Sequence, residues 1–214
     1  MRPNKLVNIY QLLLSHFGHQ HWWPGDTHFE IMVGAILTQN TNWENVSKAL
    51  DALKQEDLLS YEKLRALPAA YLAEKIKACG YFNLKAARLH NLFQFIENRY
   101  DGDIDALLAA PLEQLREDLL SVKGIGPETA DSILLYAAEK PVFVVDAYTY
   151  RILSRHDVLS EDESDYDEIQ TIITDSLPED TALYNEYHAL LVQTGKAYCK
   201  KTNPRCESCP LQGY

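Results

Sequence analysis

No stretch of the sequence approaches the ~20 consecutive apolar residues that are needed to cross a bilayer. The first residues, MRPNKLVNIYQLLLSHFG, lack the charged head, the uninterrupted apolar core and the cleavage site of a secretion signal. We therefore expect a cytoplasmic protein without a membrane partner. Strand-like runs are also scarce, because only residues 141–145, PVFVV, are short, apolar and β-branched, and they have no evident partner strand.

Cysteine is scarce, with four residues in 214, and three of the four lie near the C-terminus. In a chain without a secretion signal, this clustering favours metal binding over disulfides. The clustered residues are Cys199, Cys206 and Cys209.

Positive charge is also in deficit, since 20 Lys and Arg face 31 Asp and Glu and the net charge is -11. This balance argues against a uniformly basic nucleic-acid binder, because neutralising phosphates requires Lys and Arg at the contact surface. The acids concentrate in residues 161–168, whereas basic residues gather elsewhere, for example at Lys196, Lys200, Lys201 and Arg205. A basic surface on an acidic protein and a merely acidic soluble protein both remain open.

Helical periodicity covers most of the chain. Apolar residues recur at spacings of three and four in residues 6–17, 29–37, 46–53, 86–96 and 187–192. Glycine and proline separate these segments, and residues 141–145 fit a buried extended connector. The pattern predicts an all-α protein with one helical lobe near residues 25–138 and a second lobe built from both ends of the chain.

The strongest motif is LSVKGIGPETADSILL, residues 120–135, in which a helix end meets Gly124-Ile-Gly126 and a second helix begins. Glycines let the backbone turn tightly and approach a ligand without a Cβ in the way. Amides at the start of the second helix can then bind a phosphate. Taken alone, this pattern is more often a structural turn than a DNA-binding hairpin.

Shortly after this hairpin, the apolar run ends at Asp146, which precedes the helical pattern AYTYRIL. The hairpin, the connector and Val-Asp-x-x-x-x-Arg resemble the endonuclease III-like helix-hairpin-helix (HhH-GPD) superfamily of DNA glycosylases, over nearly the whole chain. The resemblance implies a six-helix lobe with the hairpin at residues 25–138, and a second helical lobe at residues 1–24 and 139–214. It also implies base excision from double-stranded DNA that contains a damaged base, and we expect a monomer.

In this superfamily the aspartate that corresponds to Asp146 acts on the glycosidic bond. The resemblance implies that Asp146 stabilises positive charge on the deoxyribose and orients or deprotonates the nucleophile. Its local interpretation is a helix N-cap, and both roles are compatible because a helix N-terminus favours an ionised carboxylate.

A lysine in the second hairpin helix makes some members bifunctional, within the motif Gly-Val-Gly-Arg-Lys-Thr-Ala. This chain has Glu128 at the position of that lysine. A carboxylate cannot form a Schiff base, and Lys123 lies before the glycines, where it fits a solvated or phosphate-binding lysine. We therefore expect hydrolysis without lyase activity.

The resemblance also assigns DNA contacts. Gln39, in ILTQNTNW, corresponds to the glutamine that fills the gap left by the flipped base, and Tyr81, in GYFNLKA, corresponds to the wedge. From the residues alone, Gln39 would be interpreted as a buried amide that caps a helix, and Tyr81 as an aromatic residue at an interface between lobes. Further contacts are expected from the hairpin and the C-terminal loop, at Val122, Gly124, Gly126, Lys200 and Lys201.

The lack of an acidic residue at one position of the resemblance suggests the class of substrate. Adenine-mismatch members protonate the leaving base with a glutamate where this chain has Gly34, and Glu30 lies one turn too early to replace it. This favours a base that leaves easily, such as a cationic N-alkylated purine. Such a base stacks on electron-rich rings. A pocket like that of the 3-methyladenine glycosylase branch is expected at Trp22, Trp23, Pro24 and Trp43, although an ordinary lobe interface would bury the same residues.

The three clustered cysteines match the first three ligands of the family's iron–sulfur loop, whose fourth cysteine would follow Tyr214 at position 215. Either the chain is cut short, or a cluster forms with a foreign fourth ligand, or no cluster is present. We favour a structural [4Fe-4S] cluster, with tetrahedral zinc as the alternative. Cys79 fits a small buried hydrophobe. A monovalent cation at the hairpin carbonyls is also compatible with the sequence.

The preferred hypothesis is a monofunctional DNA glycosylase for alkylated purines. Two alternatives remain: an endonuclease III-type enzyme for oxidised pyrimidines or mismatched bases, with or without lyase activity, and a non-catalytic protein that binds DNA structure. The presence of Asp146 with Gln39 and Tyr81 disfavours the second alternative, because a passive binder has no use for a base-flipping set.

Overall fold

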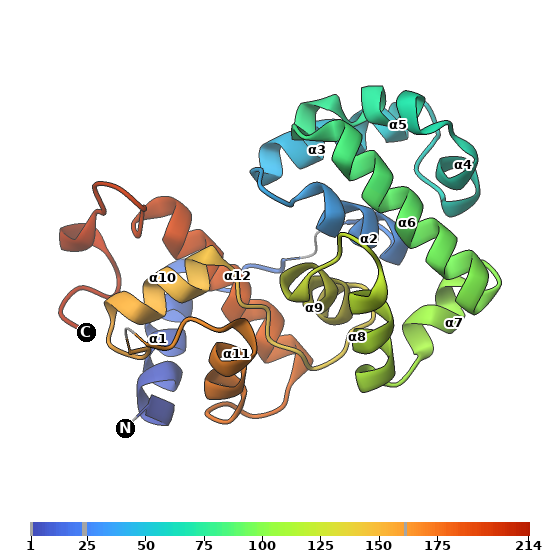
Figure 1. Ribbon diagram of the computed structural model, residues 1–214. Coiled ribbons are helices and arrows are strands. Elements are labelled where there is room, and N and C mark those ends of the chain that lie inside the picture. Colours follow the sequence, from blue (N-terminus) through green and yellow to red (C-terminus); the bar gives the residue numbers. More distant parts are fainter. Residues whose placement is uncertain (1, 23–24, 161) are drawn as a thin grey trace. The chain divides into compact units, whose positions relative to one another are not determined.

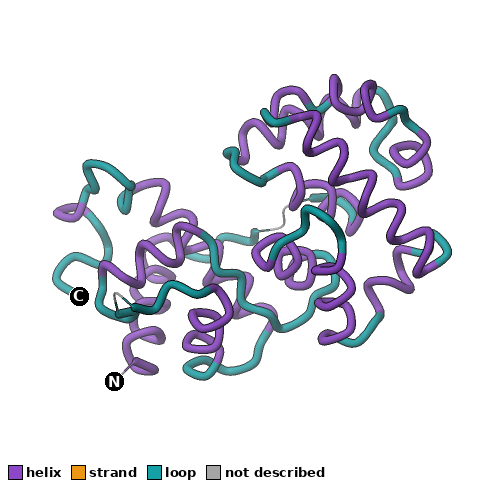
Figure 2. The backbone as a smooth tube through the Cα atoms, viewed as in Figure 1, coloured by secondary structure: helices purple, strands orange, loops and turns teal. Residues whose placement is uncertain are grey.

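The computed structural model describes residues 2–22, 25–160 and 162–214, without the side chains of residues 2–4. Every regular element among these residues is helical, so the expected all-α class is confirmed (Figures 1 and 2). The chain divides into two compact units. The central unit is Trp23–Lys140, and the terminal unit combines Met1–Trp22 with Pro141–Tyr214. None of the described helices is both long and apolar enough to cross a membrane.

The central unit is built around its longest helix, α6, which packs against α2, α4, α5 and α7 (Figure 1). Side chains of Thr27, Asn42 and Asp103 accept hydrogen bonds from backbone amides and so define the starts of α2, α3 and α7. The elements of this unit are α2 (His28–Leu37), α3 (Trp43–Gln55), α4 (Tyr61–Ala66), α5 (Ala69–Lys75), the 3₁₀ turn η1 (Lys77–Cys79), α6 (Phe82–Tyr100), α7 (Ile104–Ala109), α8 (Leu112–Ser121) and α9 (Pro127–Tyr136).

The expected hairpin is formed by α8 and α9, which pack against each other. A buried ion pair joins the two helices: Arg116 of α8 donates to both carboxylate oxygens of Asp131 of α9, at 2.8 and 3.3 Å. The carboxylate of Asp131 is fully buried. Because a buried charge is tolerated only when it is paired, this contact fixes the relative placement of the hairpin helices.

The terminal unit packs α1 (Arg2–Phe17) and α10 (Ala147–Arg155) against α12 (Thr181–Ala197). The hydroxyl of Tyr187 donates to the carbonyl of Leu6 at 2.9 Å, which joins α12 to α1. At Gly195, α12 lies so close to α10 that a Cβ would be 2.1 Å from Cδ1 of Tyr148. The remaining elements are α11 (Tyr166–Thr174) and the 3₁₀ turn η2 (Cys206–Ser208).

Residues 142–145 form the buried extended connector that the sequence predicts, drawn as a loop in Figure 2. The ring of Phe143 packs on two aromatic rings of α12, Tyr184 and Tyr187. Helix α11 supplies backbone partners, since Gln170 donates to the carbonyl of Phe143 and the hydroxyl of Tyr166 accepts from the amide of Val145. A buried strand-like segment needs such partners when no neighbouring strand provides them.

Candidate functional site

Gln39 and the hairpin are in direct contact within the central unit. The Gln39 amide donates to the carbonyl of Gly124 at 3.0 Å and to the hydroxyl of Thr129 at 2.9 Å. Its oxygen accepts from Nη1 of Arg88. The structure thus brings together two predicted DNA-contact sites that lie far apart in the sequence.

The sequence did not predict the contact between Arg88 and Gln39. The side chain of Arg88 lies against Gly124, where an added Cβ would be 2.5 Å from Cγ of Arg88. Gly124 also has a φ of +100°, which disfavours any other residue. Gly126 differs, because its φ is -102° and a Cβ there would meet open space. Only Gly124 is required by the turn, whereas Gly126 leaves the start of α9 accessible.

Substitution by serine is therefore expected to change the free energy of unfolding by different amounts at the two glycines. Gly124→Ser is expected to lower the free energy of unfolding by about 2 kcal/mol, because it combines left-handed strain with a clash. Gly126→Ser is expected to stay within about 0.5 kcal/mol, since serine is a favourable N-cap for α9. Urea denaturation of both variants measures the difference, and equal losses would contradict this division of roles.

The hairpin positions its other predicted residues differently. The side chain of Val122 is buried, which leaves only its backbone for a contact with DNA. Glu128 is exposed in the first turn of α9, where a carboxylate is favoured by the helix dipole. Gly126 has no side chain to cap α9, and Pro127 has no amide, so the next amides of that turn are oriented outward as in anion-binding helix starts.

Tyr81 is highly exposed, at 69% of its surface. Its φ of +47° follows a φ of +64° at Gly80, so two successive residues adopt left-handed backbone conformations ahead of α6. A left-handed tyrosine is strained, and such strain concentrates at functional positions. The buried ammonium of Lys85 stabilises the backbone that precedes Tyr81. It donates to the carbonyls of Leu37 and Cys79 at 2.9 and 2.7 Å.

Gly34 of α2 lies next to Trp43. A Cβ added to Gly34 would lie 3.4 Å from Cη2 of Trp43, at the start of α3. This is an ordinary van der Waals contact, so position 34 faces the indole ring of Trp43. Gly34 itself supplies no acid at the position where adenine-mismatch members carry one.

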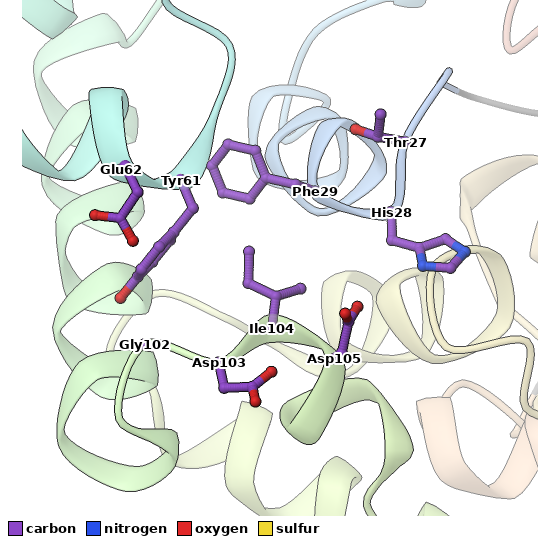
Figure 3. A pocket seen from close by; sticks show the side chains of 9 residues that line it. All are labelled: Thr27, His28, Phe29, Tyr61, Glu62, Gly102, Asp103, Ile104 and Asp105. Carbon is purple, nitrogen blue, oxygen red and sulfur yellow. The ribbon is translucent and has the colours of Figure 1, made fainter.

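A cavity of about 440 Å³ in the central unit lies apart from these residues (Figure 3). Its lining includes His28 at the start of α2 and three acidic side chains, Glu62, Asp103 and Asp105. None of the residues predicted from the sequence lines it. An acidic lining also repels phosphate, so we do not place the DNA site there.

In the terminal unit, Asp146 is the N-cap of α10, as the local sequence pattern predicts. Its Oδ1 accepts from the amide of Thr149 at 2.7 Å, and Oδ2 lies 3.7 Å from Nε2 of His188. Burial raises the pKa of Asp146, but the hydrogen bond and charge of His188, together with the Thr149 amide, outweigh burial and lower it. The carboxyl group is 13% exposed and ionised at neutral pH.

His188 gave no signal in the sequence, because it lies between buried apolar residues of α12. Lys196 lies two turns further along the same helix, and its ammonium is over the ring of Trp22, 5.4 Å from the centroid. Of the predicted pocket, Trp22 is half-buried in the terminal unit. Trp23 and Pro24 lie outside the described residues.

Two arginines of α10 hold the cysteine loop. Arg151 donates to the carbonyl of Cys199, and Arg155 donates to the Cys199 sulfur and to the carbonyls of Lys200 and Lys201. The side chains of Lys200 and Lys201 are exposed. Burial, helped by the other two cysteine thiols, raises the pKa of Cys209 although the Leu211 amide lowers it.

Cys199, Cys206 and Cys209 are the expected iron–sulfur ligands. Cys199 is buried and its sulfur accepts from Arg155, whereas Cys206 is exposed and Cys209 is partly buried. Across the described residues, no three Cys, His, Asp or Glu side chains converge as a metal-binding group. In this arrangement the described cysteines do not form the group of converging ligands that a [4Fe-4S] cluster requires.

Known proteins that are similar to this chain belong to base excision DNA repair. The HhH-GPD superfamily of base excision DNA repair proteins matches residues 33–179. A Methanocaldococcus jannaschii protein named a DNA repair glycosylase is 46% identical over all of this chain and 98% of its own length. Endonuclease III of Thermotoga maritima is 28% identical over 87% of this chain and 81% of its own.

Solved structures resemble the whole chain. An H. pylori 3-methyladenine DNA glycosylase bound to 1,N6-ethenoadenine is 31% identical, with a TM-score of 0.76, and the match covers 91% of this chain and 97% of that one. An endonuclease III–DNA covalent intermediate has a TM-score of 0.84 at 21% identity, over 98% and 93% of the two chains, and supports the fold.

The fold and the hairpin define a helical DNA repair glycosylase. This chain belongs to the HhH-GPD superfamily of base excision DNA repair proteins.

Proposed function

We propose that this protein is a monofunctional glycosylase that removes alkylated purines from double-stranded DNA by hydrolysis. The observation that carries the proposal is the carboxylate of Asp146, which is mostly buried yet kept ionised at the N-terminus of α10. A fixed anion in a site with little water stabilises the cationic sugar that forms as the glycosidic bond breaks. With its remaining lone pairs, the same carboxylate can accept a proton from the attacking water.

Hydrolysis without strand cleavage is supported by Glu128, which occupies the position where bifunctional members carry a lysine nucleophile. An alkylated purine is supported by the relative from H. pylori, a 3-methyladenine glycosylase that is 31% identical. Gly34 adds to this, because it supplies no acid at the position where adenine-mismatch members carry one.

In this proposal, the central unit binds the phosphate backbone of the DNA and fills the space that the flipped base leaves in the duplex. The first turn of α9 and the backbone of Val122, Gly124 and Gly126 would bind phosphates. Gln39 would fill the space of the flipped base, and the exposed ring of Tyr81 would separate neighbouring base pairs. Lys200 and Lys201 would add phosphate contacts from the terminal unit.

Base release tests the proposal with three duplexes, which contain 3-methyladenine, thymine glycol or adenine opposite 8-oxoguanine. We expect release of 3-methyladenine, with strand breaks only after alkali treatment. Release of thymine glycol with breaks before alkali would instead favour an endonuclease III-type lyase. If none of the three bases is released, a non-catalytic DNA-binding protein becomes the better interpretation.

The contact between His188 and Asp146 predicts a shift in the pH profile. Because His188 helps to lower the pKa of Asp146, His188→Gln should raise that pKa and so require a higher pH for the ionised carboxylate. We expect the acid limb of kcat/KM for base release to move to higher pH, with a small change on the alkaline side. His156→Gln in the same unit is the control. An unmoved acid limb would remove His188 from the mechanism.

A further inference from the structure

The face of Trp22 is already occupied by a cation. The ammonium of Lys196 lies 5.4 Å from the centroid of the indole ring, within the range of a cation–π contact. Trp22 is half-buried and Lys196 is exposed, so a ligand can reach the pair from solvent. Trp22 is one of the residues at which the sequence predicts the pocket for a flipped base.

The electrostatic surroundings of this ammonium are unusual for an exposed lysine. Loss of solvent lowers the pKa of Lys196, and the nearby carboxylate of Asp146 opposes this effect only in part. A lysine with a lowered pKa releases its proton more readily than an ordinary surface lysine. The ammonium thus interacts electrostatically with the carboxylate that the proposed function assigns to catalysis.

A resident ammonium affects which bases can bind. A cationic base stacked on Trp22 would share the ring with a second positive charge, and like charges a few ångströms apart repel each other. A neutral purine meets no such repulsion, and its ring nitrogens can accept a hydrogen bond from an ammonium. The pair therefore suits a neutral base at least as well as a cationic one.

Neutral purines are poor leaving groups unless an acid protonates them. The position used for this purpose in adenine-mismatch members is Gly34, which packs against Trp43 and has no acid. Within the described part of the terminal unit, Lys196 combines a proton donor, an aromatic ring for stacking and proximity to Asp146. Among the residues that the structure describes, the other lysines over aromatic rings, Lys75 and Lys77, lie in the central unit.

We propose that Lys196 is a general acid for the departing base, and that the substrates accordingly include neutral alkylated purines such as etheno adducts as well as cationic ones. This inference rests on the proposed function, because it takes Asp146 as the catalytic carboxylate. It adds a proton donor for the leaving base, which the resemblance to the family does not supply.

The proposed reaction balances without a further reactant. The bond between C1′ and the base nitrogen breaks, and its electron pair leaves with the base. Lys196 transfers a proton to the base, so that a neutral base departs. Water adds to C1′ and gives a proton to Asp146. Solvent then returns a proton to the Lys196 amine and accepts one from Asp146, which restores the enzyme.

The test compares two adenine-derived lesions of different charge, neutral 1,N6-ethenoadenine and cationic 3-methyladenine, in the same duplex sequence under single-turnover conditions. Lys196→Met should lower release of ethenoadenine by about 10²-fold, while release of 3-methyladenine stays the same or rises because a repelling charge is gone. Lys196→Arg should also lose ethenoadenine release, since a guanidinium does not give up its proton. Lys75→Met is the control, because Lys75 lies over the ring of Tyr71 in a similar contact.

Three outcomes would overturn the assignment of Lys196. Wild-type protein could release 3-methyladenine but no ethenoadenine, Lys196→Arg could release ethenoadenine at the wild-type rate, or Lys196→Met could lower both reactions equally, as a merely structural role requires. The proposed function fails separately, if wild-type protein releases neither base.

Discussion

Replacing Asp146 with Asn is expected to lower base release by about 10³-fold, because the reaction loses the fixed anion that stabilises the sugar cation. The substitution is well suited to the site. Asparagine is as good an N-cap as aspartate and can still accept the bond from the Thr149 amide, so α10 keeps its start. Single-turnover release of 3-methyladenine measures the loss, and a gel-shift assay on the same duplex should show retained binding.

Asp165→Asn provides the matched control, because Asp165 caps α11 in the same way and is exposed. It also lies within the acidic run 161–168, to which no catalytic role is assigned. We expect wild-type activity from this variant. A small effect at Asp146, or an equal effect at both aspartates, would refute the assignment of Asp146 and leave the N-cap as its only role.

Arg116→Met is expected to lower the free energy of unfolding by about 3 kcal/mol. The change removes the partner that donates two hydrogen bonds to Asp131 and leaves that carboxylate fully buried. The penalty arises from an uncompensated charge between the hairpin helices, rather than from the loss of a favourable surface contact. Urea denaturation followed by circular dichroism measures the effect.

Two further variants identify the cause of this loss. Arg99→Met removes a surface partner of Asp118, 3.6 Å away, and should cost less than about 1 kcal/mol. The double variant Arg116→Met with Asp131→Leu should recover most of the stability, because it removes the buried charge itself. If the double variant is as unstable as the single one, packing rather than charge explains the defect.

Local sequence patterns predicted the helical fold, because the spacing of apolar residues and the glycines and prolines between helices depend only on residues that are close in the sequence. The hairpin, the buried connector at residues 142–145 and the N-cap at Asp146 all belong to this class. The resemblance to the HhH-GPD superfamily, which the comparisons confirm, added the catalytic interpretation of Asp146. Its role in the reaction stays a prediction.

Interactions between distant residues could not be predicted in this way. His188 reaches Asp146 from another helix, Arg88 reaches Gln39 from α6, and nothing in the periodicity of either segment marks these partners. The sequence did not predict the ion pair between Arg116 and Asp131 either, since an aspartate in a helix is usually exposed. Such pairs are decided by packing, which brings side chains together only once the helices are placed.

The left-handed backbone at Tyr81 has a consequence for engineering this protein. A tyrosine in that conformation costs about 1 kcal/mol relative to a residue that adopts it freely. A redesign that ranks substitutions by thermal stability would therefore favour glycine or asparagine at position 81, and it would delete the most exposed aromatic ring among the described residues of the central unit. If Tyr81 is the wedge, gains in melting temperature at this position remove that contact with DNA, so a stabilised scaffold should keep Tyr81.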